Sequence, residues 1–224
     1  MRSLQAMGTR RDSKTGPSFV HEDALMQVHG GPVAGIDEAG RGPWAGPVVA
    51  AAVILDVDAL PQGLNDSKAL GEDTREALFE EITLNACVGV SIADVARIDR
   101  DNILQATLWA MGQACAALAT SPAAVLVDGN RCPEGLACPS QPLVKGDALS
   151  LSVAAASIVA KVTRDRIMRK LALEHPSYGW ERNKGYGTAE HVAALTGHGA
   201  CVHHRRSFRP IRDLLAREQA RAAG

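Results

Sequence analysis

Short apolar runs bounded by turn-forming residues predict the first strands of this chain. Residues 33–37 are a run of this kind that leads into an acidic pair, and a segment rich in Gly and Pro follows at 40–47. The eight residues 48–55 are apolar and have β-branched residues near both ends, which is typical of a buried strand rather than a helix. We therefore expect strands at 33–37 and 48–55 that pair as a hairpin.

After the hairpin, helical periodicity alternates with further short apolar runs. The helices expected from this pattern cover residues 75–84, 102–118, 152–175, 189–196 and 208–222. The expected strands cover residues 88–95 and 123–127, and a proline-rich loop follows the second of them at 131–143. Strands that come first and close together, and then alternate with helices, predict an α/β domain. Its mixed sheet should be antiparallel at one side and parallel at the other.

The limits of the periodic region divide the chain into three parts. Residues 1–30 lack clear periodicity, and we expect them to form a flexible N-terminal extension. Residues 31–212 contain the expected strands and most of the helices and should form the main domain, which includes helices near its C-terminal end. Residues 213–224 are expected to form a C-terminal helical tail.

Composition indicates a well-filled core that is built from small side chains. Hydrophobic residues make up 46% of the 224 positions but aromatic residues only 4%, so the core depends on Ala and Val. The formal net charge of −1 does not by itself indicate a nucleic-acid partner. Many Lys and Arg residues nevertheless fall between 161 and 221, so the second half of the chain can present a basic face.

Five cysteines are scattered along the chain without a CxxC pair, which argues against a zinc site. Cys132 and Cys138 flank a loop rich in Pro and Gly, so the sequence allows a local disulfide between them, although a reduced protein is the default expectation. The first residues lack the apolar core of a signal peptide, and no stretch approaches the roughly 20 apolar residues that span a bilayer. We expect a monomeric cytoplasmic protein that does not bind membranes.

Acidic residues recur where predicted strands or loops end. They are Asp37, Glu38, Asp128 and Asp147. Functional groups gather at the carboxyl ends of parallel strands, and carboxylates brought together there repel one another and raise each other's pKa. Mg²⁺ or Mn²⁺ relieves this repulsion, and such clusters hold two ions about 3.5–4 Å apart to cleave phosphodiesters. The alternative is that an Asp after a strand, such as Asp128 before Gly129, is only a turn residue.

The glycine-rich segment 40–47 is the second feature with chemical meaning. Its glycines allow the backbone to approach a sugar or a phosphate closely. A dinucleotide-binding loop is one alternative, but the spacing is not G-x-G-x-x-G and an apolar strand follows instead of a helix. A plain hairpin connection is the other alternative. The sequence contains no Walker A motif, so a P-loop NTPase is not supported.

The run from Ile36 to Val48 resembles the signature of the ribonuclease HII family. Further motifs of that family follow in the expected order at 66–68, 127–129, 145–147, 154–165, 184–188 and 204–208. Together they cover about residues 33–210, and several separate motifs in order make coincidence improbable. Trp44 stands where Leu is more usual, which is a mild departure that does not affect the expected chemistry.

The resemblance implies a ribonuclease H-like mixed sheet with a helical C-terminal part. It also implies an endonuclease that hydrolyses the RNA strand of RNA–DNA hybrids and nicks duplex DNA on the 5′ side of embedded ribonucleotides. Two-metal-ion catalysis with Mn²⁺ or Mg²⁺ would leave a 5′-phosphate and a 3′-hydroxyl. The catalytic and metal-binding residues carried over from the family are Asp37, Glu38, Asp128 and Asp147.

Substrate recognition also follows from the resemblance. The backbone of Gly40, Arg41 and Gly42 would hydrogen-bond the 2′-hydroxyl, which is the group that distinguishes RNA from DNA. The ring of Tyr186 would stack on the sugar of the next nucleotide. Candidate phosphate contacts are Lys68, Lys184, Arg205 and Arg206, each of which has a solvated surface charge as its alternative.

Other readings of these residues stay open. His203 and His204 are expected to have a surface or phosphate-binding role rather than to bind a metal, because their neighbours are basic. The helix at 152–171 is expected to be structural and to support Asp147. Two other functions are a hybrid-binding protein that has lost turnover, and a different two-metal nuclease or phosphatase on the same fold.

Overall fold

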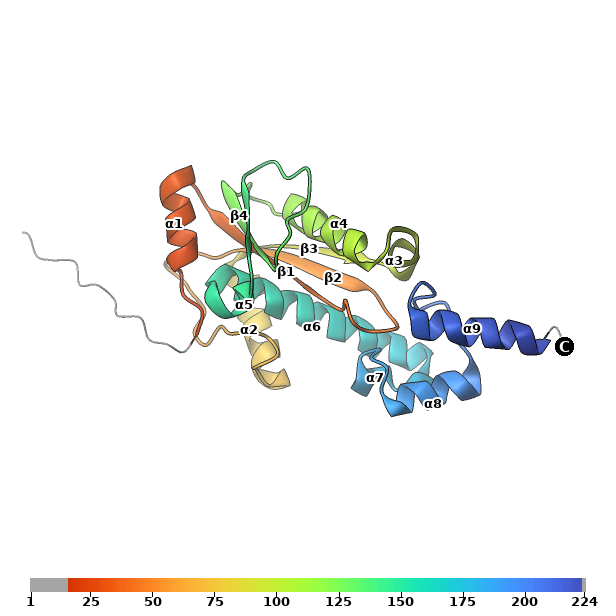
Figure 1. Ribbon diagram of the computed structural model, residues 1–224. Helices are drawn as coiled ribbons and strands as arrows, with labels where there is room; N and C mark the ends of the chain where they lie inside the picture. The colour runs from red at the N-terminus through yellow and green to blue at the C-terminus, as the bar shows by residue number, and fades with distance from the viewer. Residues whose placement is uncertain (1–15, 223–224) are drawn as a thin grey trace, which may run out of the picture.

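A five-stranded mixed sheet forms the centre of the computed structural model, which describes residues 16–222 (Figure 1). The strands lie in the order β3-β2-β1-β4-β5. Their bounds are β1 Val33–Ala39, β2 Val48–Ile54, β3 Cys87–Ala93, β4 Ala124–Asp128 and β5 Ser140–Leu143. The pairs β1–β2 and β2–β3 are antiparallel, whereas β1–β4 and β4–β5 are parallel. The expected hairpin and the division of the sheet into an antiparallel and a parallel side are therefore confirmed.

Helices cover both faces of this sheet (Figure 1). The larger ones are α2 Glu72–Asn85, α4 Ile103–Ala116 and α6 Leu151–Glu174. Every residue of β2 is buried, with alternate residues packing against α4 on one face and against α6 on the other. A strand that is buried on both faces has no polar positions to alternate with its apolar ones, which explains the continuous apolar run in the sequence.

Helix α6 lies unusually close to β1 because β1 has a glycine where the two meet. A Cβ atom built on Gly35 would lie 2.1 Å from the carbonyl carbon of Ser152 and 2.2 Å from the nitrogen of Val153. Both are backbone atoms of the helix, so they cannot move aside as the end of a flexible side chain can. The residues of α6 that face the sheet are also small, and Ala154, Ala155 and Ala156 are fully buried.

The N-terminal part of the chain differs from the flexible extension expected for residues 1–30. Helix α1, Val20–His29, packs Leu25 and Met26 beside the parallel side of the sheet. Its Glu22 is fully buried and accepts hydrogen bonds from the hydroxyl of Ser150 at 2.6 Å and the amide of Ser152 at 2.8 Å. This carboxylate thus satisfies donors at the start of α6. Residues 1–15 lie outside the described residues.

Several short elements were missed in the sequence, among them one helix before β4 and one strand after it. Strand β5 occupies the last residues of the expected proline-rich loop 131–143, and its mostly exposed residues and Pro142 are typical of an edge strand. Helix α3, Val95–Asp101, begins where the expected strand 88–95 should end. Asp94 caps this helix by accepting a hydrogen bond from the amide of Arg97 at 2.8 Å.

The C-terminal part packs against the far end of α6. It comprises the 3₁₀ turn Pro176–Tyr178 and the helices α7 Trp180–Asn183, α8 Ala189–His198 and α9 Arg209–Ala222. Tyr178 and Trp180 form the centre of a separate apolar cluster that includes Ile211 of α9. The expected tail at 213–224 is not a separate unit, because α9 runs without a break through residue 213.

The expectations about cysteines and membranes can also be compared with the structure. All five cysteines are free, so Cys132 and Cys138 do not form the local disulfide that the sequence left open. The thiol of Cys138 instead lies beside that of Cys115, where burial raises the pKa of Cys115 to about 11. Within residues 16–222, no helix has both the length and the apolarity that a membrane crossing requires.

We predict that Gly35→Ala destabilises the fold by about 1–3 kcal/mol or more, because the new methyl group would overlap the backbone of α6. The free energy of unfolding in urea measures the effect. Gly197→Ala is the matched control, since nothing lies within 4 Å of a Cβ at this helical position. The control should keep or slightly raise stability. Equal stability of the two variants would show that the close approach is not a constraint.

Candidate active site

Three of the predicted carboxylates meet where β1 and β4 end. Asp37 and Glu38 belong to β1, and Asp128 is the last residue of the neighbouring parallel strand β4. One carboxylate oxygen from each residue lies within 4.8 Å of the other two. Asp37 is 4% exposed, and its side chain accepts a hydrogen bond from the amide of Glu38 at 2.7 Å. The parallel pairing of two strands thus produces the acidic cluster that the sequence predicted.

The cluster is electrostatically unfavourable without a cation. Burial raises the pKa of Asp37 well above its ordinary value, and the charges of Glu38 and Asp128 raise it further. Burial also raises the pKa of Glu38, although Arg41, whose Nη1 lies 3.3 Å from Glu38 Oε1, opposes this shift. Several carboxylate oxygens with too few cations nearby are the donor set that suits Mg²⁺ or Mn²⁺. The residues present therefore fit a divalent metal centre.

Asp147 lies beside this cluster rather than within it. It belongs to the short helix α5, Gly146–Leu149, and the amide of the preceding Gly146 donates to Asp128 Oδ1 at 2.8 Å. Burial raises the pKa of Asp147, and the charges of Asp66 and Asp128 contribute to the same shift. The Nζ of Lys68 lies 3.8 Å from Asp147 Oδ2. Asp147 is thus linked to Asp128 through the backbone amide of Gly146, the residue before it.

A buried arginine holds the turn between β1 and β2. Arg205 is fully buried, and its guanidinium donates to four carbonyl oxygens of this turn. The acceptors are Gly46 at 2.9 Å, Arg41 at 3.0 Å, Gly40 at 2.6 Å and Pro47 at 3.2 Å. The prediction that Arg205 contacts a phosphate is therefore wrong, because all of its donor groups point into the protein.

Arg164 of α6 supports the same turn from the opposite side. It donates to the carbonyl of Pro47 at 3.0 Å, to that of Lys184 at 3.0 Å and to that of Ala45 at 3.2 Å. Burial lowers the pKa of both guanidinium groups, and the charge of Arg164 lowers that of Arg205 further. The sequence carried a signal for Arg164, since it lies four residues after Ala160 on an apolar face of the helix.

A cleft of about 490 Å³ opens beside the acidic cluster. Its walls include Glu38, the backbone of Gly40 to Gly42, Lys68 and Tyr186. Tyr186 is 50% exposed, and its Cε1 atom would lie 3.3 Å from a Cβ placed on Gly42. The structure therefore brings the predicted reader of the 2′-hydroxyl, the predicted stacking ring and one predicted phosphate contact to the same cleft.

The sequence model of the ribonuclease HII family matches residues 34–211. The chain belongs to the ribonuclease HII family. A ribonuclease HII from Nitrobacter hamburgensis is 54% identical over 212 residues, which cover 95% of this chain and 78% of that relative. A ribonuclease HII from Jannaschia sp. is 54% identical over 200 residues, which cover 89% of this chain and 98% of the relative.

Solved structures agree with this assignment. The ribonuclease H2 from Pyrococcus horikoshii has a TM-score of 0.70 and 27% identity, and the match covers 84% of this chain and 99% of that one. The ribonuclease HII in a PCNA complex from Archaeoglobus fulgidus has a TM-score of 0.63 and 27% identity, with 80% and 95% covered. The ribonuclease H-like fold with a helical C-terminal part is confirmed, and the chain is a ribonuclease H, a nuclease that hydrolyses phosphodiester bonds.

Helix α6 does more than the structural role expected for it. The hydroxyl of Ser157 lies 2.8 Å from that of Ser67, and its proximity to Asp37 lowers the pKa of Asp37 and partly offsets the effect of burial. Lys161 lines the cleft, and its Nζ lies 2.6 Å from Asp165. Sequence reasoning missed Ser157 and Lys161 because both lie in an Ala-rich run that is also explained by packing.

Other predicted contacts lie outside the cleft. The Nζ of Lys184 donates to the carbonyl of Glu181 at 2.7 Å, and Arg206 is exposed with its amide bound to Asp99. His204 does not have the expected surface role, because it is fully buried and its Nε2 lies 3.0 Å from that of His191. Burial, followed by the neighbouring His191, lowers the pKa of His204 to about 4, so the ring is neutral.

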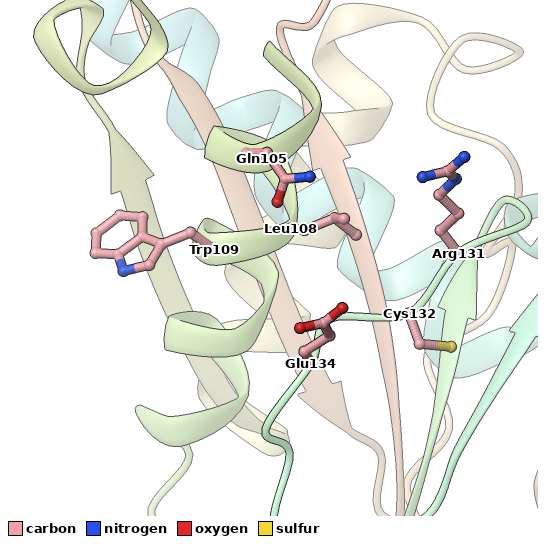
Figure 2. A pocket seen from close by; sticks show the side chains of 6 residues that line it. All are labelled: Gln105, Leu108, Trp109, Arg131, Cys132 and Glu134. Carbon is pink, nitrogen blue, oxygen red and sulfur yellow. The ribbon is translucent and has the colours of Figure 1, made fainter. Parts of the chain in front are cut away.

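A second hollow extends the site over α4. A small pocket of about 190 Å³ contains Glu38 and Asp128 and shares Leu108 and Arg131 with a larger pocket of about 460 Å³. Figure 2 shows the larger pocket, with Leu108 and Trp109 on α4 and Arg131 on the loop after β4. The surface beside the carboxylates thus has a second hollow that no motif in the sequence indicated.

We expect Arg205→Lys to lower the free energy of unfolding by at least about 3 kcal/mol, because an ammonium group cannot reach all four carbonyls and leaves buried acceptors unpaired. Chemical denaturation of the purified protein gives this value. Arg206→Lys, an exposed change at the next residue, should stay within about 0.5 kcal/mol. A similar small effect for both variants would contradict the role assigned to Arg205.

Proposed function

We propose that this protein hydrolyses the RNA strand of RNA–DNA hybrids and nicks duplex DNA on the 5′ side of an embedded ribonucleotide. The observation that carries the proposal is that Glu38, which clusters with Asp37 and Asp128, lines the same cleft as Gly40 to Gly42. Cleavage and recognition of the sugar would then occur within a few residues of each other.

The four carboxylates Asp37, Glu38, Asp128 and Asp147 are proposed as the ligands of Mg²⁺ or Mn²⁺. The chemistry that two bound ions supply at such a site is activation of water and stabilisation of the leaving 3′ oxygen, with a 5′-phosphate on the other product. The protein orients these ligands in advance. The amide of Glu38 fixes Asp37, and the amide of Gly146 fixes Asp128. The hydroxyl of Ser157 lies near Asp37 and favours its charged form.

The geometry of the turn supports recognition of the 2′-hydroxyl. The carbonyls of Gly40 and Arg41 point at Arg205. In a trans peptide the N–H group points opposite to the carbonyl of the preceding residue, so the amides of Arg41 and Gly42 point away from Arg205. Residues 40–42 line the cleft, and these two amides are the donors that we assign to the 2′-hydroxyl oxygen.

Tyr186 and the basic residues complete the proposed substrate site. The ring of Tyr186 borders Gly42 and can stack on the sugar next to the recognised ribose. Lys68, which lies between Asp147 and solvent, can bind the phosphate near the cleavage point. Arg206 is exposed and Lys184 half-buried, and both can bind the backbone of the duplex farther from the cleft, whereas Arg205 has no such role.

The nicking assay is the direct test of this proposal. Duplex DNA that carries one ribonucleotide is incubated with the protein and Mn²⁺ or Mg²⁺, and the products are sized on a denaturing gel. We expect one nick on the 5′ side of the ribonucleotide and no cleavage of the all-DNA duplex. Equal cleavage of both duplexes would instead favour a nuclease that does not recognise the 2′-hydroxyl.

Asp128→Asn should abolish nicking and leave substrate binding largely unchanged, because the proposed role of this carboxylate is to hold metal rather than nucleic acid. Single-turnover rates and the dissociation constant for the duplex measure the two effects separately. Asp58→Asn, an exposed change in a turn after β2, is the control and should keep the wild-type rate. Parallel losses of rate and binding in Asp128→Asn would argue against a catalytic role.

Two substitutions of Tyr186 separate its ring from its hydroxyl group. If stacking is the main contribution, Tyr186→Phe should retain most of the nicking rate, whereas Tyr186→Ala should weaken binding by about 1–3 kcal/mol. Binding of the ribonucleotide-containing duplex measures this difference. The two variants should be equally impaired if a hydrogen bond from the hydroxyl is the essential contact.

A further inference from the structure

A second group of metal-ligating side chains lies at the opposite end of α6 from the acidic cluster. Glu174 is the last residue of this helix, His175 follows it, and His203 comes from the loop before α9. One ligand atom from each of the three lies within 4.8 Å of the other two. Ser157, which contacts Asp37, is 17 residues from Glu174, so the two groups are roughly 25 Å apart along the helix.

The two imidazole rings are held by aromatic packing. The ring centroids of His175 and His203 are 5.1 Å apart, and each ring meets Trp180 edge-on, at 5.7 and 6.1 Å. Trp180 is fully buried in the C-terminal apolar cluster, so it provides a rigid support. The backbone is also fixed, because the His175 amide donates to the Leu171 carbonyl and the His203 carbonyl accepts from the Gly46 amide, both at 2.9 Å.

The donor set selects the ion. Two imidazole nitrogens and one carboxylate oxygen are a common protein ligand set for Zn²⁺, whereas Mg²⁺ prefers oxygen ligands alone. Bonds of about 2.0–2.1 Å in a tetrahedral site bring neighbouring ligand atoms to roughly 3.4 Å. Glu174 is exposed, so a rotamer change of its side chain can close the remaining gap between the ligand atoms.

We propose that Glu174, His175 and His203 bind one Zn²⁺ ion, with water in the fourth position. The absence of a CxxC pair argues only against cysteine ligands, and this site uses none of the five cysteines. The ion would fasten the loop that contains His203 to the end of α6. Two residues later the same loop contains Arg205, so the ion also anchors the segment that holds the turn at residues 40–47.

Calorimetric titration of the full chain with Zn²⁺, in the presence of saturating Mg²⁺, tests the proposal. We expect one Zn²⁺ to bind per chain even when Mg²⁺ is present at saturation. The affinity for Zn²⁺ should be roughly 100-fold lower in His203→Gln or His175→Gln, since loss even of residues that only support metal ligands lowers metal affinity about 10–100-fold. His198→Gln, an exposed histidine at the end of α8, is the matched control and should bind like wild type.

Two further measurements separate ligand loss from misfolding and from binding at the acidic cluster. Glu174→Gln changes an exposed side chain and should weaken Zn²⁺ binding without altering the circular dichroism spectrum. Co²⁺ bound by imidazole should absorb visible light in wild type and lose this band in His203→Gln. Zn²⁺ affinity and a Co²⁺ spectrum that are unchanged in all three ligand variants would overturn the proposal, whatever the result of the nicking assay.

Discussion

The structure depends on the contacts between two buried arginines and the carbonyl oxygens of one turn. Arg164 reaches this turn from α6 and Arg205 from the C-terminal loop, and Pro47 accepts from both. A buried cation is stable only when its donors are matched, and here the backbone provides the acceptors. Three distant parts of the chain, β1–β2, α6 and the loop before α9, are thereby fixed relative to one another. Because these two side chains hold the carbonyls of the turn, its amides also gain a defined direction.

The acidic cluster is placed next to this turn at the cost of local stability. Burial and repulsion from Glu38 and Asp128 raise the pKa of Asp37, which means that the fold disfavours the ionised form of this carboxyl group. The hydrogen bond from the Glu38 amide and the nearby Ser157 hydroxyl only partly offset this effect. A site of this kind gains its stability when cations bind, which is consistent with strain concentrated at a functional position rather than in the core.

Local patterns were sufficient to predict the hairpin, the later strand at 124–128, the long helices and the acidic residues. The buried strand β2 contains no polar residue, so its continuous apolar run is recognisable in the sequence. Asp37 and Asp128 lie directly at strand ends. Two of the misses share a cause, because each depends on a partner far away in sequence. Glu22 is recognisable as a cap only when Ser150 is beside it, and Arg205 as a buried residue only when the turn at 40–47 surrounds it. An exposed edge strand such as β5 has no apolar pattern to detect.

The missing side chain at Gly35 has a consequence for protein design. At Gly35 the backbones of α6 and β1 touch, with Ser152 of the helix opposite. Ser157 lies five residues, about 7.5 Å, farther along the helix, and Asp37 lies two residues, about 6.7 Å, farther along the strand. These similar distances bring Ser157 next to Asp37. The spacing between helix and strand therefore sets how the first carboxylate is held. Transplanting the four acidic residues onto another α/β sheet would not reproduce the site unless the new scaffold also allowed backbone-to-backbone contact at the equivalent point. Gly35 is therefore one of the residues that determine the geometry of the site, although it has no side chain.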